Sequence, residues 1–100
     1  MAYPTLTLQA FVDHLNTAFT VMVEGNQTVM LTLTEVNPLG TRPTGDVTIE
    51  SFSLIFEGPT SPMLAQSSFE FVHDQMGEFF IFIVPLGPDS GVMRYEAVFN

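Results

Sequence analysis

The chain has 100 residues, a formal net charge of −9, and neither lysine nor cysteine. With Arg42 and Arg94 as its only arginines, it lacks the positive charge that binds nucleic-acid phosphates or anionic membrane surfaces. The absence of cysteine excludes disulfides and thiolate metal sites, and no apolar run is long enough to span a bilayer.

The beginning of the chain predicts a short helix and no targeting segment. Thr7 can cap a helix whose Leu8, Phe11, Val12 and Leu15 share one face. Two turns do not hold themselves in water, so we expect this helix to dock on an apolar surface. The opening residues MAYPTLTLQAF do not form a signal peptide, so a cytoplasmic location is the default expectation. Export by a route that needs no signal peptide stays open.

From Ala18 onward the apolar period changes from helical to two, which predicts a β-hairpin over residues 19–36 with its turn at 24–27. One face of this hairpin carries the apolar residues Phe19, Val21, Val23, Val29, Leu31 and Leu33. Residues 37–47 contain two prolines and two glycines and are interpreted as a loop. This loop would expose Leu39 and Arg42.

The second half of the chain predicts a strand at 49–57, a hairpin over 66–85 with its turn at 73–77, and a last strand at 93–100. Pro85 is expected to end the strand that precedes it. The sum is one domain, residues 1–100, mainly β: a six-stranded antiparallel meander barrel or sandwich with one short N-terminal helix.

The strand GEFFIFIVP, residues 77–85, is apolar on both faces. Strand side chains alternate, so Phe80, Phe82 and Val84 lie opposite a second apolar row formed by residues 79, 81 and 83. Either the helix at 8–15 or a second subunit can cover the spare face. We therefore predict an interface at Phe80, Phe82 and Val84, with Leu39 and Arg42 as a second contact.

No motif fixes a reaction, so we predict no catalytic, cofactor-binding or metal-binding residues. His14 and His73 belong to no spaced ligand set. His73 is interpreted as a partly exposed turn histidine bonded to local backbone, and the roles of His73 and Asp74 stay open. Since cations are scarce, Arg94 is expected to be the counter-ion of strand carboxylates such as Glu96 or Glu50.

Several stretches also resemble an uncharacterised family of bacterial proteins about a hundred residues long. The likeness is carried by LTLQAF near the start, FSLIFEGP at 52–59, Gln66, His73, Gly77, FIVPLG at 82–87 and MRYEAVFN at 93–100. The resemblance implies no activity and no catalytic residues. Some members of the family are encoded near phage-tail-collar-like proteins, which implies that such a protein is an accessory or chaperone-like partner of a fibre or tail assembly.

These observations favour a non-enzymatic structural or interaction protein without cofactors, a subunit or assembly factor of a larger phage-tail-like or filamentous complex. Its expected partner is a protein, including a second copy of itself. The alternatives are a small-molecule or peptide-binding barrel with methionine and phenylalanine at its mouth, and a hydrolase that uses strand carboxylates.

Overall fold

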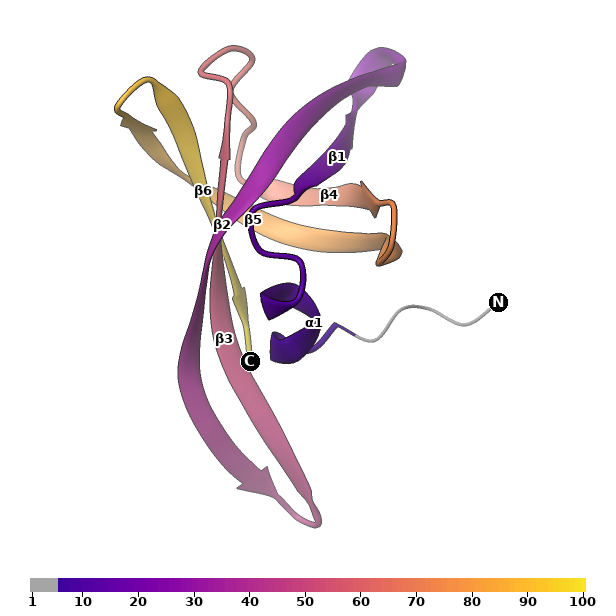
Figure 1. Ribbon diagram of the computed structural model, residues 1–100, viewed down its shortest axis with the longest axis vertical. Helices are drawn as coiled ribbons and strands as arrows, with labels where there is room; N and C mark the ends of the chain where they lie inside the picture. The colour runs from indigo at the N-terminus through magenta and orange to yellow at the C-terminus, as the bar shows by residue number, and fades with distance from the viewer. Residues whose placement is uncertain (1–5) are drawn as a thin grey trace.

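A computed structural model describes residues 6–100, which form one closed, fully antiparallel barrel with a short helix at its N-terminal end (Figure 1). The elements in chain order are α1 (Leu8–Val12), β1 (Ala18–Val23), the 3-10 turn η1 (Glu24–Asn26), β2 (Gln27–Thr44), β3 (Val47–Gly58), β4 (Ser67–His73), β5 (Gly77–Asp89) and β6 (Val92–Phe99). The predicted six-stranded antiparallel barrel with one short helix is confirmed.

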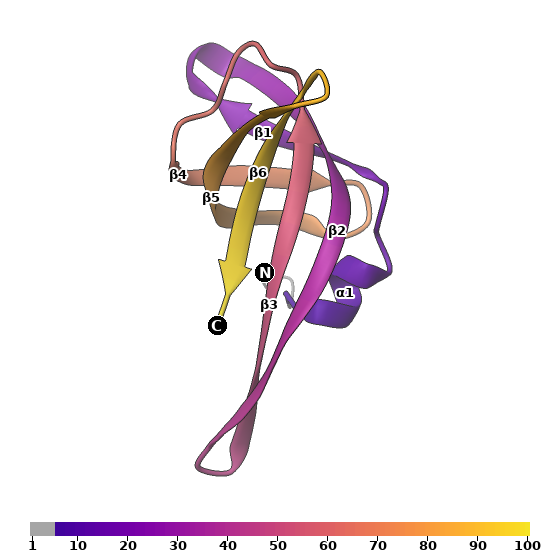
Figure 2. The ribbon, with the colours of Figure 1, turned by 90° about the vertical axis from the view of Figure 1, so that its left-hand side faces the viewer.

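The strand order around the barrel is β1-β2-β3-β6-β5-β4, which differs from a simple meander because β3 lies beside β6. The segment between β3 and β4 therefore crosses an end of the barrel, as Figure 2 shows. Tyr95 fixes this crossing: its hydroxyl accepts a hydrogen bond of 2.9 Å from the backbone N–H of Leu64, and both residues are buried. A buried N–H without such a partner would destabilise the fold.

Inward-facing side chains from every strand fill the barrel interior. The alternation predicted for the first hairpin is confirmed, since Phe19 pairs with Leu31 and Val21 with Val29, all at most 5% exposed. α1 contributes Phe11, which is fully buried. The aromatic rings around Phe11 have centroids 5.6 to 6.4 Å away and belong to Phe19, Phe52, Phe79 and Phe99. The helix thus docks on the inner face of the sheet.

The segment interpreted as a loop, residues 37–47, is instead β structure. β2 and β3 stay paired out to Thr44 and Val47, and only Gly45 and Asp46 form the turn between them. Residues 37–50, which we call the arm, project beyond the barrel as a two-stranded ribbon, and all except the half-buried Ile49 are exposed (Figures 1 and 2). The loop interpretation was wrong because prolines are tolerated in a strand whose outer edge has no partner.

β5 likewise continues past Pro85, which was expected to end it. The strand runs to Asp89 and pairs Pro85 with Tyr95 and Pro88 with Met93 of β6, with a bulge between Pro85 and Gly87. β4 pairs with β5 only as far as Ile83. The prolines therefore lie where one edge of β5 is already open, and their missing N–H interrupts no ladder.

Arg94 is a counter-ion, but its partners differ from those expected. Its guanidinium lies 2.8 Å from the carboxylate of Glu35, 3.7 Å from that of Glu57 and 3.8 Å from that of Asp89. Neither Glu96 nor Glu50 is among the ion pairs formed within residues 6–100. Glu57 is opposite Arg94 in the β3–β6 ladder, and a bulge after Leu33 places Glu35 within reach from β2.

Candidate functional site

The outer face of β5 carries the largest exposed apolar side chains of the barrel. Phe80 is 69% exposed and Phe82 is 51% exposed, whereas Val84 is half-buried. Val98 on the adjacent strand β6 is 52% exposed and lies two residues beyond Glu96, the partner of Val84. We call Phe80, Phe82, Val84 and Val98 the outer patch.

The helix does not cover the outer patch. Its Phe11 packs on the inner face of β5, where the ring centroid of Phe79 is 6.2 Å away. Of the two covers considered for residues 79–84, the helix therefore protects the inward row only. Among residues 6–100, Phe80 and Phe82 stay open to solvent. Large apolar patches of this kind are typical of binding surfaces.

The second predicted contact lies elsewhere on the molecule. Leu39, 55% exposed, sits at the bulge where the arm leaves the barrel, and Arg42 lies further out, opposite Ile49. The structure therefore does not bring Leu39 and Arg42 together with Phe80, Phe82 and Val84. It presents two separate surfaces, one on the barrel wall and one on the arm.

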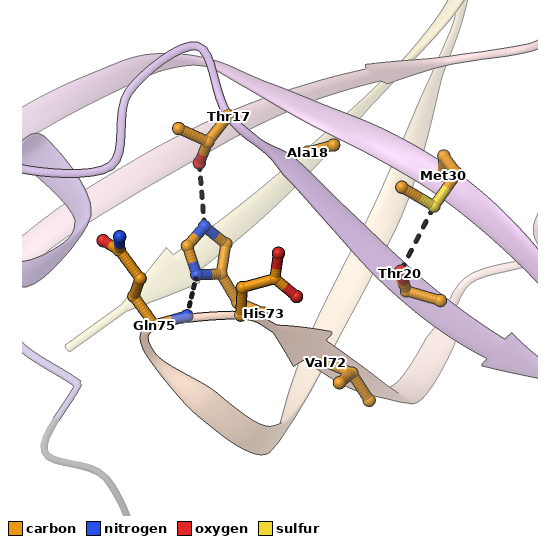
Figure 3. Close-up of a pocket in the computed structure, with 8 residues that line it drawn as sticks. Thr17, Ala18, Thr20, Met30, Val72, His73 and Gln75 are labelled. Carbon is orange, nitrogen blue, oxygen red and sulfur yellow. Dashed lines mark hydrogen bonds between the residues drawn. The ribbon is translucent and has the colours of Figure 1, made fainter.

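A third surface feature is a half-open groove of about 300 Å³ where β1 and β4 part (Figure 3). β1 and β4 pair only between Thr20–Met22 and Glu70–Val72, so the backbone ladder does not extend to the start of β1 or to the end of β4. The groove is lined by Thr17, Ala18, Thr20, Met30, Val72, His73, Asp74 and Gln75. Its volume is at the lower end of ligand pockets, which span about 300–1,000 Å³.

His73 borders this groove, and both nitrogens of its ring form hydrogen bonds. The backbone N–H groups of Gln75 and Met76 donate to Nδ1 at 3.1 and 3.2 Å, which confirms the predicted local backbone bond. Nδ1 therefore carries no proton, and Nε2 of the neutral ring donates to the Thr17 hydroxyl at 2.9 Å. The Thr17 hydroxyl in turn donates to the carbonyl of His14 at 2.6 Å.

The electrostatic surroundings of His73 also favour the neutral ring. Burial lowers the pKa of His73 below its ordinary value of 6.5, the neighbouring His14 lowers this pKa further, and the Asp74 carboxylate opposes both. The prediction that His73 is partly exposed was wrong: the residue is only 7% exposed, because it packs against the core ring of Phe19, whose centroid lies 4.4 Å from that of His73. His73 is therefore better suited to fasten the α1–β1 linker to β4 than to act as a free base.

His14 completes this fastening. Its Nδ1 lies 2.7 Å from the carbonyl oxygen of Ala10, and its Nε2 lies 3.0 Å from the side-chain oxygen of Gln75. Its ring centroid is 4.8 Å from that of His73. Within residues 6–100, no three histidine, aspartate or glutamate side chains gather as a metal site would require.

Sequence reasoning missed the groove, although one signal for it exists. On the outward face of residues 28–34, Met30 interrupts a row of threonines, and Val72 interrupts a row formed by Ser68 and Glu70. Both interruptions line the groove. Their convergence depends on the β1–β4 seam, which joins strands far apart in the sequence.

Comparisons with known proteins identify a family for the chain but assign no activity to it. A family model described as a domain of unknown function (DUF6916) matches residues 6–99. No curated protein and no solved structure matches the chain. The part of the chain that the structure describes contains no helix long and apolar enough to cross a membrane.

Proposed function

The chain belongs to the family of domains of unknown function designated DUF6916, and on that premise we propose that it is a non-enzymatic assembly protein. In this proposal, it is a subunit or assembly factor of a larger phage-tail-like or filamentous complex. Its first partner is a second copy of the chain, bound through the outer patch.

The exposure of Phe80 and Phe82 carries the proposal. The inner row of β5 is already covered by core residues including Phe11, so the outer row contributes nothing to the core of the single chain. Burying a large apolar side chain stabilises a contact by about 1.5–3 kcal/mol. Phe80 and Phe82 are 69% and 51% exposed, so a second subunit that covers the outer patch gains from each the part of this free energy that belongs to its exposed surface.

The surroundings of the outer patch also fit a protein contact. Phe80 and Phe82 pair with Glu70 and Ser68 of β4, so polar side chains border the apolar row. An apolar centre with a polar rim is the usual anatomy of a protein interface. A contact between two copies through the same patch is isologous and closes as a dimer.

The alternative, a ligand-binding barrel, has less support. Fully buried aromatic side chains, among them Phe11, Phe19, Phe56, Phe71 and Tyr95, occupy the interior where such a ligand would enter. The groove beside His73 is the observation that favours a ligand, and it lies on the outside of the barrel wall. For a hydrolase, the groove offers the carboxylate of Asp74 beside a histidine whose nitrogens are both engaged.

The test is the absolute mass of the purified protein, measured by light scattering during size exclusion over a wide range of concentration. We expect a multiple of 11.1 kDa that persists on dilution. Phe82→Glu should dissociate this species, because it places a charge at the centre of the contact. Thr28→Glu, which adds the same charge at an exposed position of β2, is the matched control.

A monomer at every concentration would contradict the self-association. So would a dissociation produced equally by Phe82→Glu and Thr28→Glu, because added negative charge alone would then explain it.

A further inference from the structure

The arm has two different faces. The cross-strand pairs Arg42–Ile49 and Thr44–Val47 place these four side chains on one face, whereas Thr41–Glu50 and Pro43–Thr48 belong to the other. Arg42 therefore shares its face with two aliphatic side chains, and the carboxylate of Glu50 points the opposite way. Val47 is 63% exposed.

Arg42 is unpaired in an acidic molecule. Within residues 6–100, the recorded ion pairs all belong to Arg94, so Arg42 has no carboxylate partner there. The chain has eleven acidic residues and two arginines, and one of these, Arg94, is already paired with carboxylates on the outer face of the barrel wall. Arg42 is thus the arginine that remains unpaired within residues 6–100, and it lies in the far part of the arm, opposite Ile49.

The groove between β1 and β4 has the complementary chemistry. Ala18, Met30 and Val72 give it apolar walls, and Met30 is 52% exposed. Asp74, which is exposed, supplies a negative charge that no cation within residues 6–100 neutralises. Since His73 is held neutral by its two backbone donors, it does not offset the charge of Asp74.

We infer that the arm of one copy docks in the groove of the next, with Arg42 paired to Asp74 and the Val47–Ile49 side of the arm against Met30 and Val72. An arm of two strands with no core of its own is marginally stable in water, which suits a segment that is ordered further by a neighbour. The inference rests on the proposed self-association and adds a second, independent contact to it.

The two contacts have different geometric consequences. The outer patch pairs with itself and stops at two copies, whereas the arm and the groove are different surfaces of one chain. A contact between different surfaces is head-to-tail, and it continues into a ring or an open filament. Together they predict a mass that grows with concentration above a dimer that persists on dilution.

A charge reversal tests the pairing of Arg42 with Asp74. The mass of each protein is followed by light scattering as its concentration rises. We expect Arg42→Glu and Asp74→Arg each to raise the concentration needed for growth by about tenfold or more, because each places like charges in contact. The double variant Arg42→Glu/Asp74→Arg should restore growth, as should an equal mixture of the two single variants.

Asp46→Asn, at the turn of the same arm, is the matched control and should leave growth unchanged. Growth that persists in both single variants, or that stays absent in the double variant and in the mixture, overturns the arm contact. If the dimer persists in these proteins, the proposed function stands without the arm contact. If the wild-type protein is a monomer throughout, both are overturned.

Discussion

β2 and β3 pair with each other both in the barrel and in the arm, but the two parts of this ladder have different roles. In the barrel half, Leu31, Leu33, Leu54 and Phe56 are completely buried. In the arm half, Ile49 is the sole residue that reaches partial burial. Backbone pairing continues through both halves, so the ladder alone does not report which part of a strand stabilises the fold. The side chains decide it: the barrel half supplies the core, and the arm half supplies surface.

The largest expected effect falls on the barrel half. Phe11→Ala removes a fully buried ring that four other rings contact, and truncation of a core phenylalanine costs about 3–5 kcal/mol of unfolding free energy. Urea denaturation followed by circular dichroism measures this loss. Val12→Ala, on the same helix but 39% exposed, is the control and should change stability by less than about 1 kcal/mol. If both changes lowered the unfolding free energy equally, the conclusion that Phe11 belongs to the core would be contradicted.

A smaller effect is expected where the α1–β1 linker is fastened to the barrel. The pKa of His73 is lower in the folded protein than its ordinary value of 6.5, so the unfolded chain binds more protons as the pH falls. The stabilisation from His73 is therefore complete above pH 6.5 and is lost as the pH falls toward the lower, folded pKa.

His73→Asn keeps a side-chain acceptor for the turn and does not titrate. Between pH 7 and 5, the wild type should lose unfolding free energy more steeply than His73→Asn, because all carboxylates are common to both proteins. Denaturant titrations at each pH provide the comparison. If the unfolding free energies of the two proteins fell in parallel with pH, the pKa of His73 would not differ between the folded and unfolded chains.

The smallest effect on stability is expected in the arm. Replacing residues 42–49 by Asn-Gly would close the hairpin directly between Thr41 and Glu50, which already pair. Because the removed residues are exposed or half-buried, unfolding free energy should change by no more than about 1 kcal/mol. Thermal unfolding of the two proteins measures it. A loss of several kcal/mol would show that the arm supports the barrel, and the contrast between the two halves would fail.

The alternation of apolar residues in the sequence predicts which side chains face the core. It does not predict features that depend on which distant strands lie side by side. The core face of the first hairpin was predicted correctly, because side chains two residues apart on a strand share a face. These residues are Phe19, Val21, Leu31 and Leu33. Pro38 and Pro43 indicated a loop, since nothing local says that the outer edge of β2 is open where they lie. That edge is open because β1 pairs with β2 only as far as Thr32.

The candidate surfaces divide in the same way. The exposed row of Phe80 and Phe82 could be predicted from one strand, because both faces of that strand are apolar. The groove could not, since it requires β1 and β4 to meet and then part. The partners of Arg94 were also inaccessible: its contact with Glu35 crosses β3 and depends on a bulge in the β2–β3 register.

Because the ladder between β1 and β4 is short, we expect the barrel to open first between these two strands. This seam consists of three residue pairs, whereas every other neighbouring couple of strands shares five or more. If it parts, no piece detaches, because β1 stays joined to β2 and β4 to β5. The ring then becomes a curled sheet with two free edges, and free edges are where chains aggregate. Protection of this protein from edge-to-edge aggregation therefore depends on Thr20, Val21 and Met22 keeping their partners.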